Sequence, residues 1–312
     1  MQYTEINGLK ISQITLGTVQ LGLNYGINNA EGQPSKKLAG EILSAAVKGG
    51  ITSLDTSSDY GTSEKVLGEY FAEHKENKPT IITKCSVNDW DKVLPEKEVE
   101  KRLREQTESS LKNLGYNKLP LLLLHDERDL DNYESLLPKI LKKMQDENLI
   151  ERAGISLNHF SYIDKVLKSD IFEAVQLPLN MMNVKDATGN GIEKLAENNV
   201  AVFVRSVFLQ GLFFRDPETL PQGVLQNAKE PLKKMRKIAE EENVSVAELA
   251  IAYIRDLEGV VSLVMGAEKP EQVKENIALI NCKSLSDGAR QKIVETFKDV
   301  DERVLSPWLW NK

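Results

Sequence analysis

Leu121-Leu122-Leu123-Leu124 is an uninterrupted apolar run that is followed at once by His125. A strand that is apolar on both faces is typical of a parallel sheet with helices outside it and packed side chains inside. Seven further short apolar runs, many of them rich in β-branched residues, share this character. The eight predicted strands are Ile14–Thr18, Ser53–Thr56, Thr80–Lys84, Leu119–His125, Ala153–Ser156, Ala174–Leu177, Ala201–Ser206 and Val261–Gly266.

Segments with helical spacing of apolar residues lie between these strands, for example at 38–46, 99–114, 136–144 and 246–254. Eightfold alternation of strand and helix indicates a (β/α)8 TIM barrel, for which about 250 residues is typical. The residues beyond that length are assigned to three extra elements. These are an N-terminal hairpin at Asn7-Gly8, the connection Val207–Lys229, and a C-terminal helix and tail from Leu285 to Lys312. We expect residues 1–312 to form a single domain.

Motifs and composition disfavour several other fold and function classes. The alternative fold is a doubly wound open sheet, but no G-x-G-x-x-G motif follows the first strand. Forty Lys and Arg against 47 Asp and Glu leave a net charge of −7, which disfavours nucleic acid as a partner. No leader segment and no run of about 18 apolar residues is present, so we expect a cytoplasmic protein with no membrane partner, either a monomer or a homodimer. The two cysteines, Cys85 and Cys282, predict neither a disulfide framework nor a metal site.

Polar residues stand where three successive strands end. Asp55 ends the second strand and Tyr60 follows in its loop, Lys84 ends the third strand, and His125 ends the fourth. Each alone has an ordinary structural explanation, such as a turn cap, a packed tyrosine, a solvated charge or a core histidine. In a barrel, however, the carboxyl ends of the strands form the active-site rim. Their convergence there predicts a catalytic site.

The residues around these positions resemble signatures of the aldo-keto reductase superfamily. The run Leu54–Gly61 with Glu64 resembles its first signature, and Ile82–Lys84 and Leu124-His125 resemble two later ones. The resemblance covers nearly the whole chain and is closer to bacterial members. It implies reduction of an aldehyde or ketone, with a sugar-type compound as one possibility, or the reverse reaction. It also implies a catalytic tetrad of Asp55, Tyr60, Lys84 and His125.

The chemistry of these four side chains suits that reaction. Hydride delivered to a carbonyl carbon leaves negative charge on oxygen, so the site must supply a proton there. We expect Tyr60 to be the proton donor, because the neighbouring ammonium of Lys84 favours the phenolate that remains. Asp55 would hold the lysine. His125 would bind the substrate oxygen or relay the proton.

By the same resemblance, three groups of residues would bind the nicotinamide cofactor. Ser156, Asn158 and Gln176 would hold its carboxamide. Arg205, Ser206 and the loop to Gly211 would follow the pyrophosphate, unless Arg205 instead forms a salt bridge at the rim. The adenine-ribose side would be bound at the start of the last barrel helix by Gly266, Ala267, Glu268, Lys269, Gln272, Glu275 and Asn276.

Glu268 bears on the choice between the two nicotinamide cofactors. A carboxylate repels a 2'-phosphate and can accept hydrogen bonds from a free ribose hydroxyl. Lys269 and the helix N-terminus act in the opposite direction. The resemblance favours NADP(H), with NAD(H) possible.

Aromatic residues in the rim loops are the expected walls of a pocket for a small carbonyl compound. The candidates are Tyr25, Trp90 and Trp308. Trp308 and Trp310 could equally pack the tail onto the barrel. Arg128 could bind an anionic group of the substrate or pair with a neighbouring acid, and the sequence does not decide between these roles. His74 and His159 receive no role.

Two other functions remain open at this point. Proteins of the same fold can keep the cofactor and act as regulatory or redox-sensing subunits. Alternatively, Lys84 could form a Schiff base in an aldolase or isomerase barrel, which trapping with borohydride would detect.

Overall fold

The computed structural model describes residues 1–25, 32–76, 78–87 and 92–310. Within these residues, eight parallel strands form a closed barrel in chain order, and the last strand pairs with the first. The predicted TIM barrel and all eight predicted strands are confirmed. The strands are β3 (Ile14–Gly17), β4 (Ser53–Asp55), β5 (Thr80–Cys85), β6 (Leu119–Leu124), β7 (Ile150–Ser156), β8 (Phe172–Pro178), β9 (Ala201–Arg205) and β10 (Val260–Gly266).

The leucine run of β6 is buried on both faces of the strand. Side chains of a strand alternate between its two faces, so Leu121 and Leu123 join a small cluster inside the barrel. Leu122 and Leu124 face the other way and belong to the large core under the helices. All four are buried. A strand with two buried faces is stable only between two packed layers, which a barrel with an outer helical ring supplies.

An N-terminal hairpin covers the barrel mouth at which the strands begin. Strands β1 (Tyr3–Ile6) and β2 (Leu9–Ser12) pair antiparallel, as expected. The turn residues Asn7 and Gly8 have φ of 51° and 73°, a conformation that Asn-Gly adopts readily. Ile11 of β2 packs into the inner cluster, so the hairpin seals this mouth and leaves the opposite one for a ligand.

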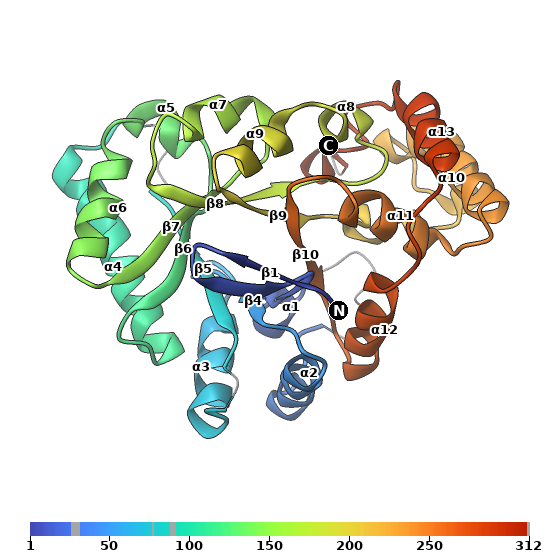
Figure 1. The fold of residues 1–312 in the computed structure, drawn as a ribbon. Coiled ribbons are helices and arrows are strands. Elements are labelled where there is room, and N and C mark those ends of the chain that lie inside the picture. Colours follow the sequence, from blue (N-terminus) through green and yellow to red (C-terminus); the bar gives the residue numbers. More distant parts are fainter. Residues whose placement is uncertain (26–31, 77, 88–91, 311–312) are drawn as a thin grey trace.

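Helices form a ring outside the strands (Figure 1). The α-helices that the structure describes are α1 (Val19–Gly22), α2 (Lys36–Lys48), α3 (Ser63–Glu73), α4 (Glu96–Leu114), α5 (Asp129–Tyr133), α6 (Leu137–Asp146), α7 (Ile163–Val166), α8 (Val184–Ala187), α9 (Gly191–Glu197), α10 (Lys229–Glu241), α11 (Val246–Arg255), α12 (Pro270–Ile280) and α13 (Asp287–Phe297). The expected C-terminal helix is therefore present as α13.

The expected long connection after β9 holds short 3-10 helices in place of regular α-helix. They are η2 (Leu209–Phe214), η3 (Pro217–Thr219) and η4 (Val224–Ala228), and two others, η1 (Phe160–Tyr162) and η5 (Pro307–Leu309), lie after β7 and in the tail. None of the helices in the described ranges is long and apolar enough to span a bilayer. The same residues contain no group of three or more His, Cys, Asp and Glu side chains that could hold a metal ion.

Candidate active site

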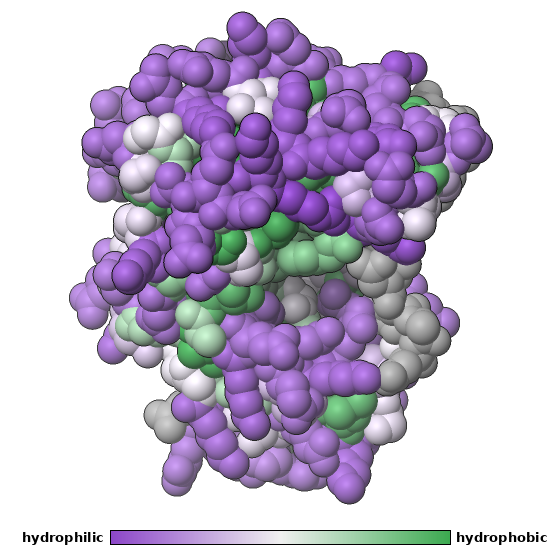
Figure 2. Space-filling view, turned by 90° about the vertical axis from the view of Figure 1, so that its right-hand side faces the viewer, coloured by the Kyte–Doolittle hydropathy of each residue, from purple (hydrophilic) through white to green (hydrophobic). Residues whose placement is uncertain are grey.

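A cavity of about 1190 Å³ lies at the carboxyl ends of the barrel strands. Residues at or near the carboxyl ends of six of the strands line it: Asp55, His125, Ser156, Gln176, Arg205 and Gly266. Figure 2 shows a largely hydrophilic surface with hydrophobic residues gathered in a hollow across the middle of the face in view. Because all barrel strands run in one direction, their ends bring residues far apart in the chain to this one mouth.

Lys84 is the centre of the polar cluster in this cavity. Its Nζ donates to Asp55 Oδ1 at 2.6 Å, to the Thr56 carbonyl at 2.8 Å and to the Tyr60 hydroxyl at 3.5 Å. The side chain is 1% exposed. Burial opposes its charge, but the nearby Asp55 and Tyr60 outweigh burial and raise the pKa of Lys84. The lysine is therefore a fixed ammonium group that touches the tyrosine hydroxyl.

Asp55 holds a second partner besides the lysine. Gln176 Nε2 donates to Asp55 Oδ1 at 2.7 Å, and both side chains are buried. The carboxylate thus fixes Lys84 from β5 and Gln176 from β8 at the same oxygen. This shared acceptor ties the polar cluster around Lys84 to a residue predicted to bind the cofactor.

His125 completes the set of four predicted catalytic side chains. Its ring meets that of Tyr60 edge to face, with centroids 5.8 Å apart and an interplanar angle of 74°. Its Nδ1 lies 3.0 Å from Asp59 Oδ2 and 3.2 Å from Ser57 Oγ. The structure therefore brings Asp55, Tyr60, Lys84 and His125 together.

The environment of Lys84 argues against a Schiff-base role. An amine must lose its proton before it can attack a carbonyl. Lys84 is buried in an ion pair that raises its pKa, so the neutral form is disfavoured. Cys85 next to it is also buried, and burial raises the pKa of its thiol, which suits a packing role.

The residues predicted to bind the cofactor divide into two groups. Those that line the cavity are Ser156, Asn158, Gln176, Arg205, Ser206, Gly211, Gly266 and Glu268. Those that do not are Ala267, Lys269, Gln272, Glu275 and Asn276. Several of the second group instead shape the start of α12, since Asn276 Nδ2 donates to the Gly266 carbonyl at 3.2 Å and Gln272 Oε1 accepts from the backbone N–H groups of Glu268 and Lys269.

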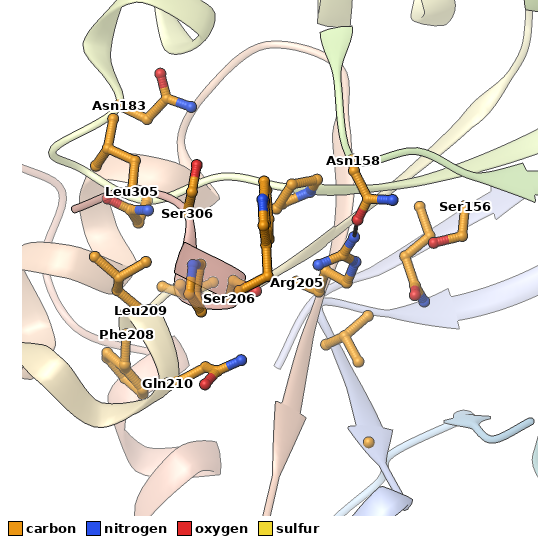
Figure 3. A pocket seen from close by; sticks show the side chains of 18 of the residues that line it. Ser156, Asn158, Asn183, Arg205, Ser206, Phe208, Leu209, Gln210, Leu305 and Ser306 are labelled. Atoms are coloured by element: carbon orange, nitrogen blue, oxygen red, sulfur yellow. Dashed lines mark hydrogen bonds between the residues drawn. The ribbon is translucent and has the colours of Figure 1, made fainter. Parts of the chain in front are cut away.

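Asn158 and Arg205 form a connected pair on the cavity wall (Figure 3). Asn158 Nδ2 donates to the buried Glu127 carboxylate at 3.0 Å, and its Oδ1 accepts from Arg205 Nη2 at 2.7 Å. Arg205 Nη2 also donates to the Leu157 carbonyl at 3.1 Å. Among the described residues the guanidinium forms no ion pair, so the alternative of a salt bridge at the rim is wrong. Burial lowers the pKa of Arg205, although nearby acids and tyrosines oppose this.

The predicted substrate residues behave differently from one another. Tyr25 and Trp308 line the cavity, and the Trp308 ring meets the His159 ring edge to face with centroids 6.1 Å apart. Trp310 is buried and donates to the Val304 carbonyl at 3.0 Å, so it packs the tail down. Trp90 lies outside the described residues.

Arg128 is not brought to the cavity. Its Nε and Nη2 donate to the two Asp126 carboxylate oxygens at 2.8 and 2.7 Å. This bidentate geometry is the best that a guanidinium can form with a carboxylate. Of the two roles left open for Arg128, pairing with the neighbouring acid is the one that the structure supports.

Gln20 lines the cavity although no pattern in the sequence singled it out as a ligand-binding residue. Its Oε1 is buried without a hydrogen-bond partner among the described residues. Its amide lies over Gly266, where an added Cβ would stand 2.4 Å from Gln20 Nε2. The cavity is larger than the roughly 300–1,000 Å³ of ordinary ligand pockets. Gln20 Oε1, which lacks a partner, lies there next to the backbone of Gly266, which carries no side chain. This size and this polar wall fit a dinucleotide.

The loop that carries Tyr60 depends on a glycine in α1. A Cβ on Gly22 would stand 1.8 Å from the Tyr60 carbonyl oxygen and 2.4 Å from the Ser63 nitrogen, both of them backbone atoms. We expect Gly22→Ala to lower the free energy of unfolding by about 1–3 kcal/mol, as overpacking does. Urea unfolding measures this change.

Gly40 supplies the matched control for that measurement. It lies in α2, where an added Cβ would meet nothing closer than Tyr70 Cδ2 at 3.7 Å. Because alanine favours helix, Gly40→Ala should stabilise the protein by roughly 0.4–1 kcal/mol. Equal stability of the two variants would show that Gly22 does not seat the Tyr60 loop.

A closed barrel with buried ionisable side chains in a large cavity at its carboxyl mouth defines a TIM-barrel enzyme. Within that class, this chain belongs to the aldo/keto reductase family, whose sequence model matches residues 13–296. The family predicted from the sequence is thereby confirmed, and the protein is an oxidoreductase of this family.

Individual relatives agree with that assignment. The chain is 26% identical to the uncharacterized oxidoreductase YqkF of Bacillus subtilis over 295 residues, which cover 89% of this chain and 90% of the relative. It is 25% identical to the aldo-keto reductase YhdN of the same organism, over 88% and 87% of the two chains. The solved structure of the aldo-keto reductase AKR11C1 from Bacillus halodurans in its holo form has the same fold, with a TM-score of 0.76, 21% identity, and 95% and 96% of the two chains covered.

Proposed function

We propose that this protein reduces an aldehyde or ketone to the alcohol, or catalyses the reverse reaction, with Tyr60 as the proton donor and a nicotinamide dinucleotide as cofactor. The observation that carries the proposal is the contact of the buried Lys84 ammonium with both Asp55 and the Tyr60 hydroxyl inside the large cavity. An acid that is to donate its proton at neutral pH needs such a partner to stabilise its anion.

Residues on three sides of the cavity would hold the cofactor. Ser156 and Gln176 offer polar side chains for its carboxamide, Arg205 and Ser206 offer donors for its phosphates, and Gln20 and Gly266 form a polar and open surface between them. When bound, reduced nicotinamide supplies the hydride. The Asn158 amide is engaged at both ends, so we assign it the role of orienting Arg205.

The chain's own residues would handle the proton. Tyr60 donates its hydroxyl proton to the substrate oxygen as negative charge develops there. Lys84 then stabilises the phenolate at a distance of 3.5 Å, and Asp55 keeps the lysine charged and in place. Each of these groups is held before the reaction starts, so little reorganisation is needed during the reaction.

Turnover with a panel of sugars, small aldehydes and ketones, followed at the nicotinamide absorbance with each cofactor, tests the proposal. We expect reduction of at least one class of carbonyl compound. Tight cofactor retention without turnover on any of them, together with a stable protein partner, would instead support the regulatory alternative.

The start of α12 favours NAD(H) over the NADP(H) that the family resemblance suggested. Gln272 Oε1 accepts from the Glu268 nitrogen at 2.6 Å and from the Lys269 nitrogen at 3.3 Å, which engages two donors that a 2'-phosphate would need. Glu268 itself lines the cavity and would repel such a phosphate. We therefore propose a preference for NAD(H).

Glu268→Ser should tighten NADPH binding about tenfold, because it removes about 1–2 kcal/mol of repulsion, and should leave NADH binding unchanged or weaker. Cofactor fluorescence titration measures both dissociation constants. Glu193→Ser is the matched control, because Glu193 is an exposed glutamate in the first turn of a different helix, α9, and does not line the cavity. A wild-type protein that binds NADPH far more tightly than NADH would overturn this preference.

A further inference from the structure

A second hydrogen-bonded cluster, made of His125, Asp59 and Ser57, lies next to the Lys84 cluster. His125 Nδ1 lies 3.0 Å from Asp59 Oδ2 and 3.2 Å from Ser57 Oγ. The backbone N–H of Asp59 donates to Ser57 Oγ at 3.1 Å, which holds the aspartate and the serine in one turn. The three residues come from the loop after β4 and the end of β6, and they line or adjoin the cavity.

The distances decide which nitrogen of the ring carries the proton. A carboxylate oxygen only accepts hydrogen bonds, so an unprotonated Nδ1 would turn its lone pair toward Asp59 at 3.0 Å. A protonated Nδ1 instead donates to Asp59, and Ser57 Oγ can accept at the same time. The hydrogen bond with His125 lowers the pKa of Asp59 most, with Lys84 adding to the effect although burial opposes it, so the group stays a carboxylate.

We propose that Asp59 is a positioning residue that fixes the Nδ1–H tautomer of His125 and so presents Nε2 to the substrate oxygen. Nε2 makes no hydrogen bond to any described residue, and His125 lines the cavity. Nε2 can therefore form a hydrogen bond with a ligand in the cavity. Only the substrate part of this inference rests on the proposed function; the tautomer part stands on the contacts of the protein alone.

With Nδ1 protonated in both charge states, His125 has two distinct binding modes. The neutral ring offers a lone pair at Nε2 and accepts the hydroxyl proton of an alcohol. The doubly protonated ring offers a donor at Nε2 to a carbonyl oxygen, and Asp59 supplies the counter-charge. The charged or titratable groups around the ring are Asp59 and Tyr60 after β4, Lys84 in β5, and Asp126 after β6. The positive charge of Lys84 helps to lower the pKa of Asp59.

The composition of the chain allows a direct spectroscopic test. It contains only three histidines, His74, His125 and His159, so 15N-histidine labelling gives three ring systems. Loss of one set of two-bond proton–nitrogen correlations in His125→Gln assigns His125. In the unliganded wild-type protein, at a pH where the ring is neutral, we expect the pattern of the Nδ1–H tautomer. In Asp59→Ala we expect this pattern to be lost in favour of the Nε2–H tautomer.

Asp126→Asn is the matched control for the spectrum. Asp126 follows His125 directly, but its carboxylate is held by Arg128 and not by the imidazole. It should leave the His125 tautomer unchanged. An Nε2–H pattern in the wild type, or an unchanged pattern in Asp59→Ala, would overturn the inference.

Steady-state kinetics supply a second test of the role of Asp59. In metal sites, loss of the group that orients a ligating histidine typically costs 10–100-fold, and we expect Asp59→Ala to lower kcat/KM for carbonyl reduction by roughly the same factor while cofactor affinity is retained. Asp59→Asn keeps an oxygen acceptor without the charge, so it should preserve the tautomer and lose less activity. If wild-type turnover is present but Asp59→Ala matches it, the positioning role is wrong. If the tautomer follows Asp59 but no carbonyl is reduced, the proposed function fails and the positioning role stands.

Discussion

Tyr60→Phe is expected to lower kcat for carbonyl reduction by about 10²–10⁴-fold, the range that general acid catalysis contributes. The change removes one hydroxyl, the group that Lys84 contacts at 3.5 Å, and keeps the ring that packs edge to face with His125. Cofactor affinity should therefore survive, and the loss should appear in kcat. Steady-state kinetics and a cofactor titration of the same preparation measure the two effects separately.

Tyr70→Phe serves as the control for this variant. Tyr70 lies in α3, the helix that follows the Tyr60 loop, and its ring stacks on His74. It should reduce carbonyl compounds like the wild type. Turnover of Tyr60→Phe at the wild-type rate would remove Tyr60 from the mechanism and leave His125 or the Lys84 ammonium as the proton donor of the cluster.

Lys84→Met is expected to lower kcat by a comparable factor and also to destabilise the fold. Methionine retains much of the side-chain volume but leaves the Asp55 carboxylate buried without its ion-pair partner. Breaking a buried pair in this way typically costs about 3–5 kcal/mol. Urea unfolding should therefore show a large loss of stability, and the kinetics should be measured well below the unfolding midpoint.

A double variant separates the two effects of Lys84. In Lys84→Met with Asp55→Asn no charge is left unpaired, so stability should largely return while activity does not. Wild-type turnover in Lys84→Met would mean that the ammonium is not needed to stabilise the phenolate. Recovery of activity together with stability in the double variant would mean that Lys84 acts only on folding.

The fold could be predicted because it depends on local sequence patterns. The apolar run Leu121–Leu124 is typical of a strand buried on both faces, and the Asn7-Gly8 pair favours a tight hairpin. Once the barrel is inferred, the positions of Asp55, Lys84 and His125 at strand ends follow, since the carboxyl ends of parallel strands converge. The meeting of these side chains with Tyr60 in one cluster could thus be predicted from the sequence.

The supporting contacts were not within reach, because they depend on side-chain conformations across separate loops. Asp59 is 66 residues from His125 in the chain, and no spacing or motif in the sequence pairs the two residues. Likewise, nothing in the pattern around Asn158 indicates that its amide joins Glu127 to Arg205. Gln272 was expected to contact the cofactor, but in the structure its amide oxygen meets the backbone of its own helix start.

The central claim is that Asp55, Tyr60, Lys84 and His125 act together on a carbonyl group beside a bound nicotinamide. Its most direct test uses reduced cofactor deuterated at C4 of the nicotinamide on one face or the other, with mass analysis of the alcohol formed. The account predicts deuterium on the former carbonyl carbon from one labelled face only, and no labelled product with Tyr60→Phe on the same timescale. Label-free alcohol from both labelled cofactors, or equal labelling by Tyr60→Phe and the wild type, would contradict it.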